Sequence, residues 1–472
     1  MIWILTGAAL LLSCPQQGGQ DPSTEYAIVV SDATASDAAW AGVIEALREK
    51  RRARVVRYGP AMEGARAELA RMSPRYVCFV CRAEEAGREF VVSAHRITRM
   101  LDDDPYTDAL WGILTGYDAG DALKIARTRE PLRIERAGAG CGLDLNLFKQ
   151  GQWFSECEKN LSWKKDAGEE PRKIACPDDT TRDLVALLNK DRPQFFMTSG
   201  HATHRDWQIG FSYRNGEFRC RNGQLFGLAT DGTRHDVDSP SPKVYCAAGN
   251  CLMGWIEDRE TMAPAWMRSA GVRQLVGYVV STWYGYGGWG VNHYFLEQAG
   301  RFTFAESFFL NQQALLHRLE TEFPEAARLA IDRWDLETDS ALLDRFARRH
   351  GIAEKDALGL LWDRDTVAFY GDPAWEARVV PDLDLGWKQA LSDEDGKLIF
   401  SLTTLRAGSW RRPPAALFGR SIPGLSVLEG EEFHPLVTDD FLLVPRTGDF
   451  QAGEEIRVVV GRAEKASPSA EE

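Results

Sequence analysis

A histidine and a cysteine each follow a short apolar run in this sequence, an arrangement that supports nucleophilic chemistry. Residues 194–200 precede His201, and residues 243–248 precede Cys251 after a Gly-Asn step. If both runs are neighbouring parallel strands, their carboxyl ends lie at one edge of a sheet, where ligand crevices open in α/β folds. The sequence therefore predicts that an imidazole and a thiol share one cleft.

These two side chains complement each other in amide hydrolysis. A cysteine thiol is largely protonated near neutral pH, and a neighbouring imidazole generates the reactive thiolate. The same imidazole then protonates the leaving amine, while backbone N–H groups stabilise the oxyanion. Cys251 is a better candidate nucleophile than Cys246, because Cys246 falls inside the second apolar run, where a strand would bury its side chain.

Four short motifs surround or follow the histidine and the cysteine. They are His201-Ala-Thr-His-Arg-Asp-Trp207, Ala248-Gly-Asn-Cys-Leu-Met-Gly254, Val280-Ser-Thr-Trp283 and Phe369-Tyr-Gly-Asp-Pro373. In type and order they resemble motifs of the gingipain-like cysteine peptidases of clan CD, which have a caspase-like fold. The resemblance extends over roughly residues 25 to 378. The spacing of about 50 residues between histidine and cysteine is also the one found in caspases, although such spacings do not transfer between families.

The resemblance implies a role for each matched residue. His201 corresponds to the catalytic base and Cys251 to the nucleophile that forms a thioester acyl-enzyme. The backbone N–H groups of Ala202 and Cys251 correspond to the oxyanion hole. Trp283 and Tyr284 correspond to residues that shape the pocket for the substrate side chain. The family usually has glycine at the position of Ala202, so this N–H is available only if the backbone conformation suits a residue with a Cβ.

Two functions follow from this comparison. The first is an exported cysteine endopeptidase that acts on a peptide or protein substrate and needs no cofactor for catalysis. The second is a catalytically inactive gingipain-like protein that binds a peptide or protein at the cell surface. The intact pair of strand-end residues favours the first function, and Ala202 favours the second.

Other chemistries at these histidines fit less well. His201, His204 and His235 together with a cysteine resemble a zinc ligand set, but His201 and His204 follow a strand instead of lying on a helix, and no glutamate separates them. Ser199 lies only two residues before His201, which leaves no room for a serine nucleophile. The sequence contains neither a Rossmann Gly-x-Gly-x-x-Gly fingerprint opening a helix nor a P-loop, so nucleotide binding is not predicted.

Composition limits the class of protein and of partner. The chain has 472 residues, enough for two or three domains, and it is 44% hydrophobic and 26% charged. Its net charge of −13 disfavours nucleic acid as a partner. The acidic run from Asp102 to Asp104 supplies carboxylates suited to a structural Ca²⁺, but such runs are more often solvated loops.

The first 24 residues are typical of an export leader followed by a tether. Residues 1–13 form an apolar run that is too short to span a bilayer permanently, and residues 11–14 resemble a bacterial lipobox in which Cys14 is lipidated. Against lipidation, no lysine or arginine precedes the run. We therefore expect export from a bacterial cytoplasm to a periplasmic, membrane-anchored or secreted location, with membrane contact only through the Cys14 anchor.

The remaining chain predicts an α/β unit followed by a β unit. Strands and helices alternate from residue 26 to 128, which is typical of parallel βαβ units in a doubly wound, mostly parallel sheet of the caspase-haemoglobinase type. Residues 132–177 are expected to be irregular. Asn-Gly and Asp-Gly pairs between His201 and Cys251 predict type I′ hairpins in a small antiparallel flap, and residues 292–334 predict helices.

These patterns divide the chain into five expected segments. Residues 379–462 are β-prone and resemble the immunoglobulin-like β-sandwich that follows the catalytic unit in gingipains. The segments are a leader and tether (1–24), an N-terminal α/β subdomain (25–150), a caspase-like catalytic subdomain (151–378), a β-sandwich (379–462) and a disordered tail (463–472).

Overall fold

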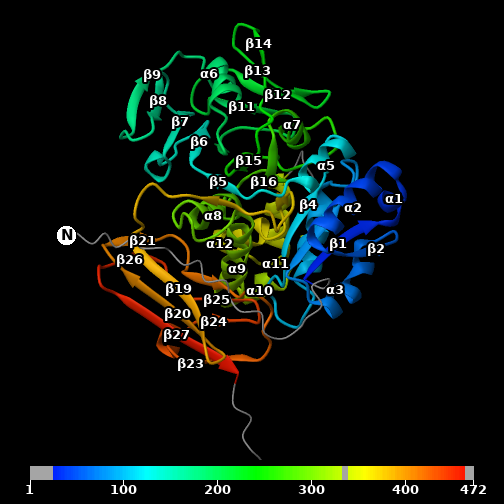
Figure 1. The fold of residues 1–472 in the computed structure, drawn as a ribbon, viewed down its shortest axis with the longest axis vertical. Helices are drawn as coiled ribbons and strands as arrows, with labels where there is room; N and C mark the ends of the chain where they lie inside the picture. The colour runs from blue at the N-terminus through cyan, green and yellow to red at the C-terminus, as the bar shows by residue number, and fades with distance from the viewer. Residues whose placement is uncertain (1–24, 332–338, 463–472) are drawn as a thin grey trace, which may run out of the picture.

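A large, mostly parallel sheet organises the chain. The computed structural model describes residues 25–331 and 339–462, so the expected leader with Cys14, the tail from residue 463, and Trp334 lie outside the described residues. Figure 1 shows the sheet crossing the upper and central molecule. In spatial order its strands are β2 (Arg54–Tyr58), β1 (Tyr26–Ser31), β3 (Tyr76–Val80), β4 (Leu110–Leu114), β17 (Val367–Tyr370), β16 (Val272–Tyr278), β15 (Lys243–Ala247), β10 (Phe195–Thr198), β6 (Arg136–Ala139), β7 (Gln150–Phe154), β8 (Leu161–Lys165) and β9 (Arg172–Ala175).

The first part of the sheet follows the predicted βαβ alternation. Strands β1, β2, β3 and β4 are parallel to their neighbours, and β1 and β4 are buried at every residue, as expected for strands covered on both faces. The intervening helical elements are α1 (Asp32–Ser36), α2 (Ala38–Arg51), η1 (Met62–Ala65), α3 (Arg66–Met72), α4 (Arg88–Thr98) and α5 (Ala119–Arg127). Asp37 caps α2 through its side chain, which accepts from the N–H of Ala39.

The prediction that residues 132–177 are irregular is wrong. β6 pairs with β10 in parallel, and β7, β8 and β9 extend the sheet beyond it. β5 (Leu132–Ile134) pairs with β18 (Ala377–Val379) in a separate two-stranded sheet. Tertiary packing overrides the weak local preference of this polar, glycine-containing stretch. Trp153 and Trp163 lie opposite each other on β7 and β8 with ring centroids 6.5 Å apart, a cross-strand pair that local composition does not reveal.

In sequence, the predicted antiparallel flap lies between β10, which precedes His201, and β15, which precedes Cys251. Its strands are β11 (Asp206–Gln208), β12 (Glu217–Arg221), β13 (Gln224–Leu228) and β14 (Arg234–Asp236). Asn222 and Gly223, between β12 and β13, both have positive φ (53° and 70°), which a type I′ turn requires. At the other two pairs the first residue has negative φ, so the type I′ prediction is wrong there.

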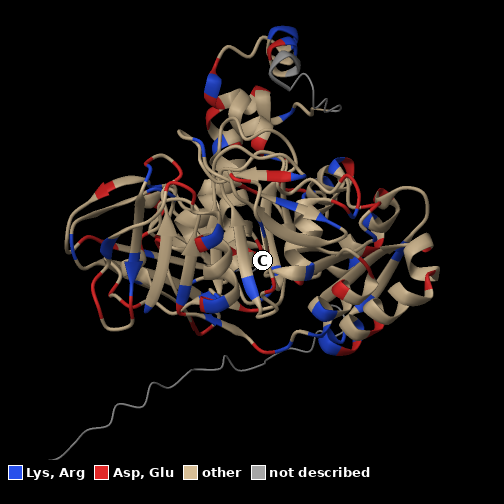
Figure 2. Cartoon of the chain, turned by 90° about the horizontal axis from the view of Figure 1, so that it is seen from above, with Lys and Arg blue, Asp and Glu red and all other residues tan. Residues whose placement is uncertain are grey.

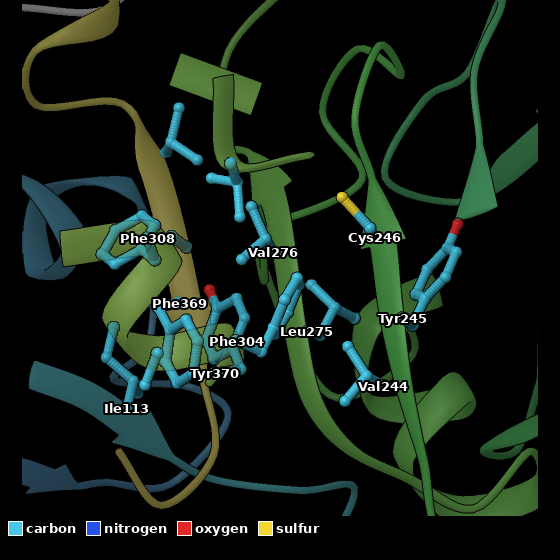
Figure 3. Packing of buried hydrophobic residues seen from close by; sticks show 14 of the residues in the cluster. Ile113, Val244, Tyr245, Cys246, Leu275, Val276, Phe304, Phe308, Phe369 and Tyr370 are labelled. Carbon is cyan, nitrogen blue, oxygen red and sulfur yellow. The ribbon is translucent and has the colours of Figure 1, made fainter. Parts of the chain in front are cut away.

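The remaining α-helices lie between residues 181 and 363, in the part of the chain that contains β10, β15 and β16. They are α6 (Thr181–Ala186) with a π-helical turn at Leu187–Asp191, α7 (Met262–Ser269), α8 (Tyr286–Phe295), α9 (Phe304–Glu322), α10 (Pro324–Ala327), α11 (Asp339–His350) and α12 (Lys355–Asp363). The helical stretch expected from residue 292 is interrupted before Thr303, which begins α9 with a capping box to Glu306. Figure 3 shows Phe304 and Phe308 of α9 beside Phe369 of β17, at ring-centroid distances of 5.8 and 5.4 Å.

The Phe369–Pro373 motif fastens β17 to the first part of the sheet. Asp372 is 1% exposed, and its carboxylate lies 2.8 Å from Lys50 Nζ and 2.7 Å from Arg51 Nη2. The hydroxyl of Tyr26 donates to the same carboxylate at 2.8 Å. Gly371 has a φ of 115°, and a Cβ there would lie 2.2 Å from the backbone oxygen of Arg273, so only glycine fits. The motif is therefore structural here.

The C-terminal part forms smaller antiparallel sheets around a core of their own. One sheet contains β19 (Trp387–Glu394), β20 (Lys397–Thr404), β27 (Glu455–Arg462) and β23 (Leu425–Glu429). The others pair β21 (Gly408–Trp410) with β26 (Gly448–Phe450), and β22 (Ala415–Leu417) with β25 (Phe441–Leu443) and β24 (Leu436–Val437). Figure 1 places these strands on one side of the α/β part, and Phe441 packs against Tyr106 and Phe309 of that part.

Charge and length features add two observations. Figure 2 shows lysine and arginine interspersed with aspartate and glutamate along the described chain. Among the described helices, none is both long and apolar enough to cross a bilayer.

Candidate active site

His201 and Cys251 follow two strands that are direct neighbours. β10 and β15 pair in parallel, and their last paired residues are Thr198 and Ala247. His201 lies three residues beyond Thr198, and Cys251 lies four residues beyond Ala247. Figure 3 shows the buried side chains of β15 and of its neighbour β16, among them Tyr245, Cys246 and Val276. His201 and Cys251 therefore both follow the sheet at the same edge, as the sequence predicts.

Cys251 is half-buried and held by the segment that follows β16. The backbone N–H of Thr282 donates to Cys251 Sγ at 3.3 Å, and the Thr282 hydroxyl donates to the backbone oxygen of Asn250 at 2.9 Å. Leu252, the next residue, has a φ of 59° and donates its N–H to Val280 at 3.0 Å. These contacts fix the position of the sulfur beside the backbone of Thr282.

Asn250 links the two strand ends. Its side chain is fully buried, its Oδ1 accepts a hydrogen bond from the Thr198 hydroxyl, and its Nδ2 donates to the backbone oxygen of Gly200 at 3.1 Å. Gly200 has a φ of 90°, a conformation that glycine adopts without strain. This buried amide fixes the residue before the histidine relative to the residue before the cysteine.

His201 is exposed, and its ring stacks on Phe211. The ring centroids are 4.7 Å apart, with an interplanar angle of 29°. Within residues 25–331 and 339–462, no side chain forms a hydrogen bond with the imidazole, and no hydrogen bond joins it to Cys251. Catalytic hydrogen bonds in ligand-free enzymes are often long and shorten only when substrate binds.

Ala202 has a conformation that suits a residue with a Cβ. It forms an isolated antiparallel bridge with Trp207, flanked by hydrogen bonds from Thr203 N–H to Asp206 and from Gln208 N–H to His201. This is the non-hydrogen-bonded type of pair, so the N–H of Ala202 points away from Trp207. Across the described chain, the N–H groups of Ala202 and Cys251 have no hydrogen-bond partner.

Glu156 adjoins the histidine segment, and the sequence did not predict it. It follows β7, and a Cβ on Gly200 would lie only 2.9 Å from its Oε2. That oxygen is buried and makes no hydrogen bond. Burial raises the pKa of Glu156 to about 7, although a hydrogen bond from Ser199 acts in the opposite direction. Only the identification of β7 as a sheet strand would have revealed a carboxyl group here.

The loop after β16 presents one of the two expected pocket residues to solvent. Trp283 is 41% exposed and directly follows Thr282. Tyr284 instead packs on α12, where a Cβ on Gly359 would lie 2.3 Å from its ring, and its hydroxyl accepts from Arg318 at 3.2 Å. Asp363, also in α12, accepts a hydrogen bond from the N–H of Gly287 at 2.8 Å and so holds the start of α8, the helix that follows this loop.

The rival residues at the site are accounted for by packing. Cys246 is fully buried in β15, and burial raises the pKa of its thiol to about 12. His204 lies on the ring of Trp255 at 4.2 Å and 3.2 Å from a carboxylate oxygen of Glu257. In the described ranges, the histidines and cysteines form no group that could hold a metal ion. The described residues at this edge therefore do not form the zinc ligand set that the histidine spacing resembles.

A group of carboxylates lies where the α/β part meets the C-terminal part. Asp102, Asp104 and Asp439 have oxygens within 4.8 Å of one another. Burial, reinforced by neighbouring carboxylates, raises the pKa of Asp108 to about 9 and that of Asp440 to about 8. Asp439 and Asp440, from the loop before β25, thus lie close to the acidic run from Asp102 to Asp104.

The cysteines of the described chain are all free thiols. Cys157 is exposed, Cys176, Cys220 and Cys251 are half-buried, and the remaining four are buried. The four buried cysteines are Cys78, Cys81, Cys141 and Cys246. Cys78 and Cys81 lie in the core, Cys78 within β3 and Cys81 directly after it.

Comparisons with known proteins give only distant similarities. No protein-family model matches the sequence, and no curated protein matches it significantly. A solved structure described as a complex of Porphyromonas gingivalis RgpB pro- and mature domains is similar at a TM-score of 0.41 and 11% identity, covering 93% of each chain. A structure described as a protease is similar at a TM-score of 0.39 and 9% identity, covering 92% of this chain and 97% of the other. TM-scores this low do not by themselves establish a shared fold.

Proposed function

We propose that the protein is a cysteine endopeptidase with Cys251 as nucleophile and His201 as general base and acid. The observation that carries the proposal is the parallel pairing of β10 with β15, which brings both residues to one sheet edge. Cys246 does not compete as the nucleophile, because its side chain is buried. Zinc binding does not compete either, because the described histidines do not come together in a group that could hold a metal ion. The sequence motifs around both residues resemble those of gingipain-like peptidases.

The reaction follows from the chemistry of the pair. His201 accepts the proton of Cys251, and the thiolate attacks the carbonyl carbon of the scissile peptide bond. The C–N bond then breaks as the imidazolium gives its proton to the leaving amine, which leaves a thioester on Cys251. His201 next deprotonates a water molecule that hydrolyses the thioester, releasing the carboxyl product and restoring the thiol.

Backbone groups at the strand ends support this reaction. The N–H of Thr282 contacts the sulfur and holds it at the sheet edge. The N–H groups of Ala202 and Cys251 are free to donate to an oxyanion, and Ala202 does not require glycine at its backbone conformation. Trp283 supplies an exposed apolar wall beside the nucleophile for a substrate side chain. No cofactor enters this mechanism.

The setting of the activity is part of the proposal. We infer that the leader directs the protein out of a bacterial cytoplasm, that lipidation of Cys14 anchors it to a membrane, and that it acts there on peptides or proteins. The acidic net charge and the interspersed surface charges support protein over nucleic acid as a substrate. The C-terminal sheets act as a module that supports the catalytic unit.

One observation favours the alternative function, an inactive peptide- or protein-binding module. The sulfur of Cys251 interacts with the N–H of Thr282, and the imidazole of His201 stacks on Phe211, so the described structure does not join them by a hydrogen bond. In an inactive module the cleft would bind a peptide without cleaving it.

Alkylation of the thiols distinguishes the two functions. Iodoacetamide is added to the intact protein at neutral pH, and alkylated cysteines are mapped by mass spectrometry in a Cys157→Ser background. Cys251 should react faster than the half-buried Cys176 and Cys220, and His201→Ala should slow it by about 100-fold. His204→Ala is the matched control and should leave the rate unchanged. Equal rates in wild type and His201→Ala would reject a catalytic pair.

A further inference from the structure

An exposed aromatic side chain covers the imidazole of the site. Phe211 is 50% exposed, an uncommon position for a large apolar ring, and it stacks on His201 with centroids 4.7 Å apart. Its Cβ and Cδ2 lie 3.6 and 3.8 Å from the position that a Cβ on Gly200 would take. Phe211 therefore contacts both the histidine and the residue before it.

The loop that carries Phe211 is fastened to the segment after β7. The N–H groups of Phe211 and Ser212 both donate to the backbone oxygen of Glu156, at 2.7 and 3.1 Å. The hydroxyl of Tyr213 donates to the backbone oxygen of Ser155 at 2.7 Å. Three hydrogen bonds to two adjacent residues hold the loop in place, so the backbone position from which the Phe211 ring projects is fixed.

No other described side chain orients the imidazole. A catalytic histidine is usually held by a carboxylate or amide that accepts its second N–H. Glu156 adjoins Gly200, but its buried Oε2 makes no hydrogen bond, and the side chain that hydrogen-bonds its carboxyl group is Ser199. Among the described residues, stacking on Phe211 is thus the contact that fixes the plane of the His201 ring.

We propose, on the basis of the Cys251–His201 function above, that Phe211 is the positioning residue of His201. Its ring face restricts the rotation of the imidazole and excludes water from one side of it. In this proposal the antiparallel flap of β11 to β14 positions the ring, because Phe211 lies in the connection between β11 and β12. The exposed half of the ring is left to contact a substrate.

The stacking itself is tested by NMR on the intact protein. Its eight histidines are labelled at Cε1, and the signal of His201 is assigned by its loss in His201→Ala. An aromatic face shifts the protons above it upfield, so Phe211→Leu should move the His201 signal downfield and Phe211→Tyr should leave it nearly in place. Leu405→Ala removes an equally exposed apolar side chain elsewhere and should move nothing. An unchanged signal in Phe211→Leu would overturn the proposal.

The consequence for chemistry is tested separately. Phe211→Leu should slow alkylation of Cys251 by iodoacetamide about tenfold, and Phe211→Tyr should restore the rate. With a cleaved peptide, kcat should fall while KM changes little. A raised KM with unchanged kcat would show that Phe211 only contacts substrate, and it would overturn the positioning role while leaving the peptidase intact. Equal alkylation in wild type and His201→Ala would reject the peptidase itself, whatever the NMR shows.

Discussion

Asn250 Nδ2 donates a hydrogen bond to the backbone oxygen of Gly200, which ties the residue before Cys251 to the residue before His201. The two reactive residues come from strands that are far apart in sequence, so their relative position depends on contacts of this kind. The Thr198 hydroxyl completes the link by donating to Asn250 Oδ1. A buried amide with both ends satisfied is well suited to set a fixed geometry.

Asn250→Ala should therefore weaken both the fold and the chemistry. The change leaves the buried Thr198 hydroxyl with Tyr245 as its remaining partner and removes the donor to the half-buried Gly200 carbonyl, which costs about 1–3 kcal/mol of unfolding free energy. Alkylation of Cys251 should also slow by about tenfold, because the strand ends lose their link. Urea denaturation and mass spectrometry measure the two effects. Asn146→Ala, at an exposed position, is the control, and equal effects of both variants would contradict the role of Asn250.

Glu156 predicts a pH dependence of stability. Burial raises its pKa to about 7 in the folded protein, whereas a glutamate in an unfolded chain has a pKa of about 4.3. Between these values the unfolded chain releases its proton first, so the free energy of unfolding falls as the pH rises from about 4 to 7. Glu156→Gln cannot ionise and should gain stability relative to wild type at pH 8 but not at pH 4. Glu158→Gln, which is exposed, should show no such difference; a parallel change in both variants would contradict the assignment.

The carboxylates at the junction with the C-terminal part predict a second pH effect. Burial raises the pKa of Asp108 to about 9 and that of Asp440 to about 8, so these groups destabilise the fold increasingly as the pH rises above about 4. Asp108→Asn should reduce this loss in thermal unfolding measured from pH 5 to pH 9.

The carboxylates of Asp102, Asp104 and Asp439 present oxygens close together, which suits Ca²⁺. Millimolar Ca²⁺ should raise the melting temperature more at pH 8 than at pH 5, because burial raises the pKa of Asp104 to about 6 and its carboxylate is ionised only at the higher pH. Mg²⁺ at the same ionic strength is the control, and an equal effect of both ions would argue against a Ca²⁺ site.

Asp372 should be among the most sensitive positions for stability. Its carboxylate is buried between Lys50 and Arg51, which hold its pKa below the usual value despite its burial. Asp372→Ala leaves these cations without their partner and should cost about 3–5 kcal/mol. In wild type, the contribution of Asp372 is present above the unfolded pKa and is lost as the pH falls through the lower folded value. Asp238→Ala, an exposed site, is the matched control in urea denaturation; comparable losses in the two variants would show that the buried pairing contributes little.

The sequence predicted those parts of the molecule whose local pattern matches their final environment. The alternation of strands and helices from β1 to α5 is readable because β1, β3 and β4 are apolar and largely buried, and because α2 and α5 begin at the side-chain caps Asp37 and Asp118. The same logic placed Cys246 inside a strand and Cys251 beyond its end. Adjacent parallel strands then bring His201 and Cys251 to one edge, which is a rule of topology.

The parts that the sequence did not predict depend on long-range contacts. Strands β7 to β9 are polar, and their stability comes from pairing with β6 and from the Trp153–Trp163 contact. Because β7 was missed, Glu156 was missed with it. The contact of Phe211 with His201 was not predicted, since this stacking depends on how the flap folds back over the sheet edge.

The central claim is tested most directly by digestion of a peptide library with the purified protein. Wild type should cleave internal peptide bonds, and Cys251→Ala should abolish cleavage while keeping the melting temperature of the parent. Cys157→Ala, which removes the exposed thiol near the site, should cleave at the rate of wild type. Cleavage by Cys251→Ala at the wild-type rate would contradict the assignment of the nucleophile, and with it the account of this sheet edge as a peptidase site.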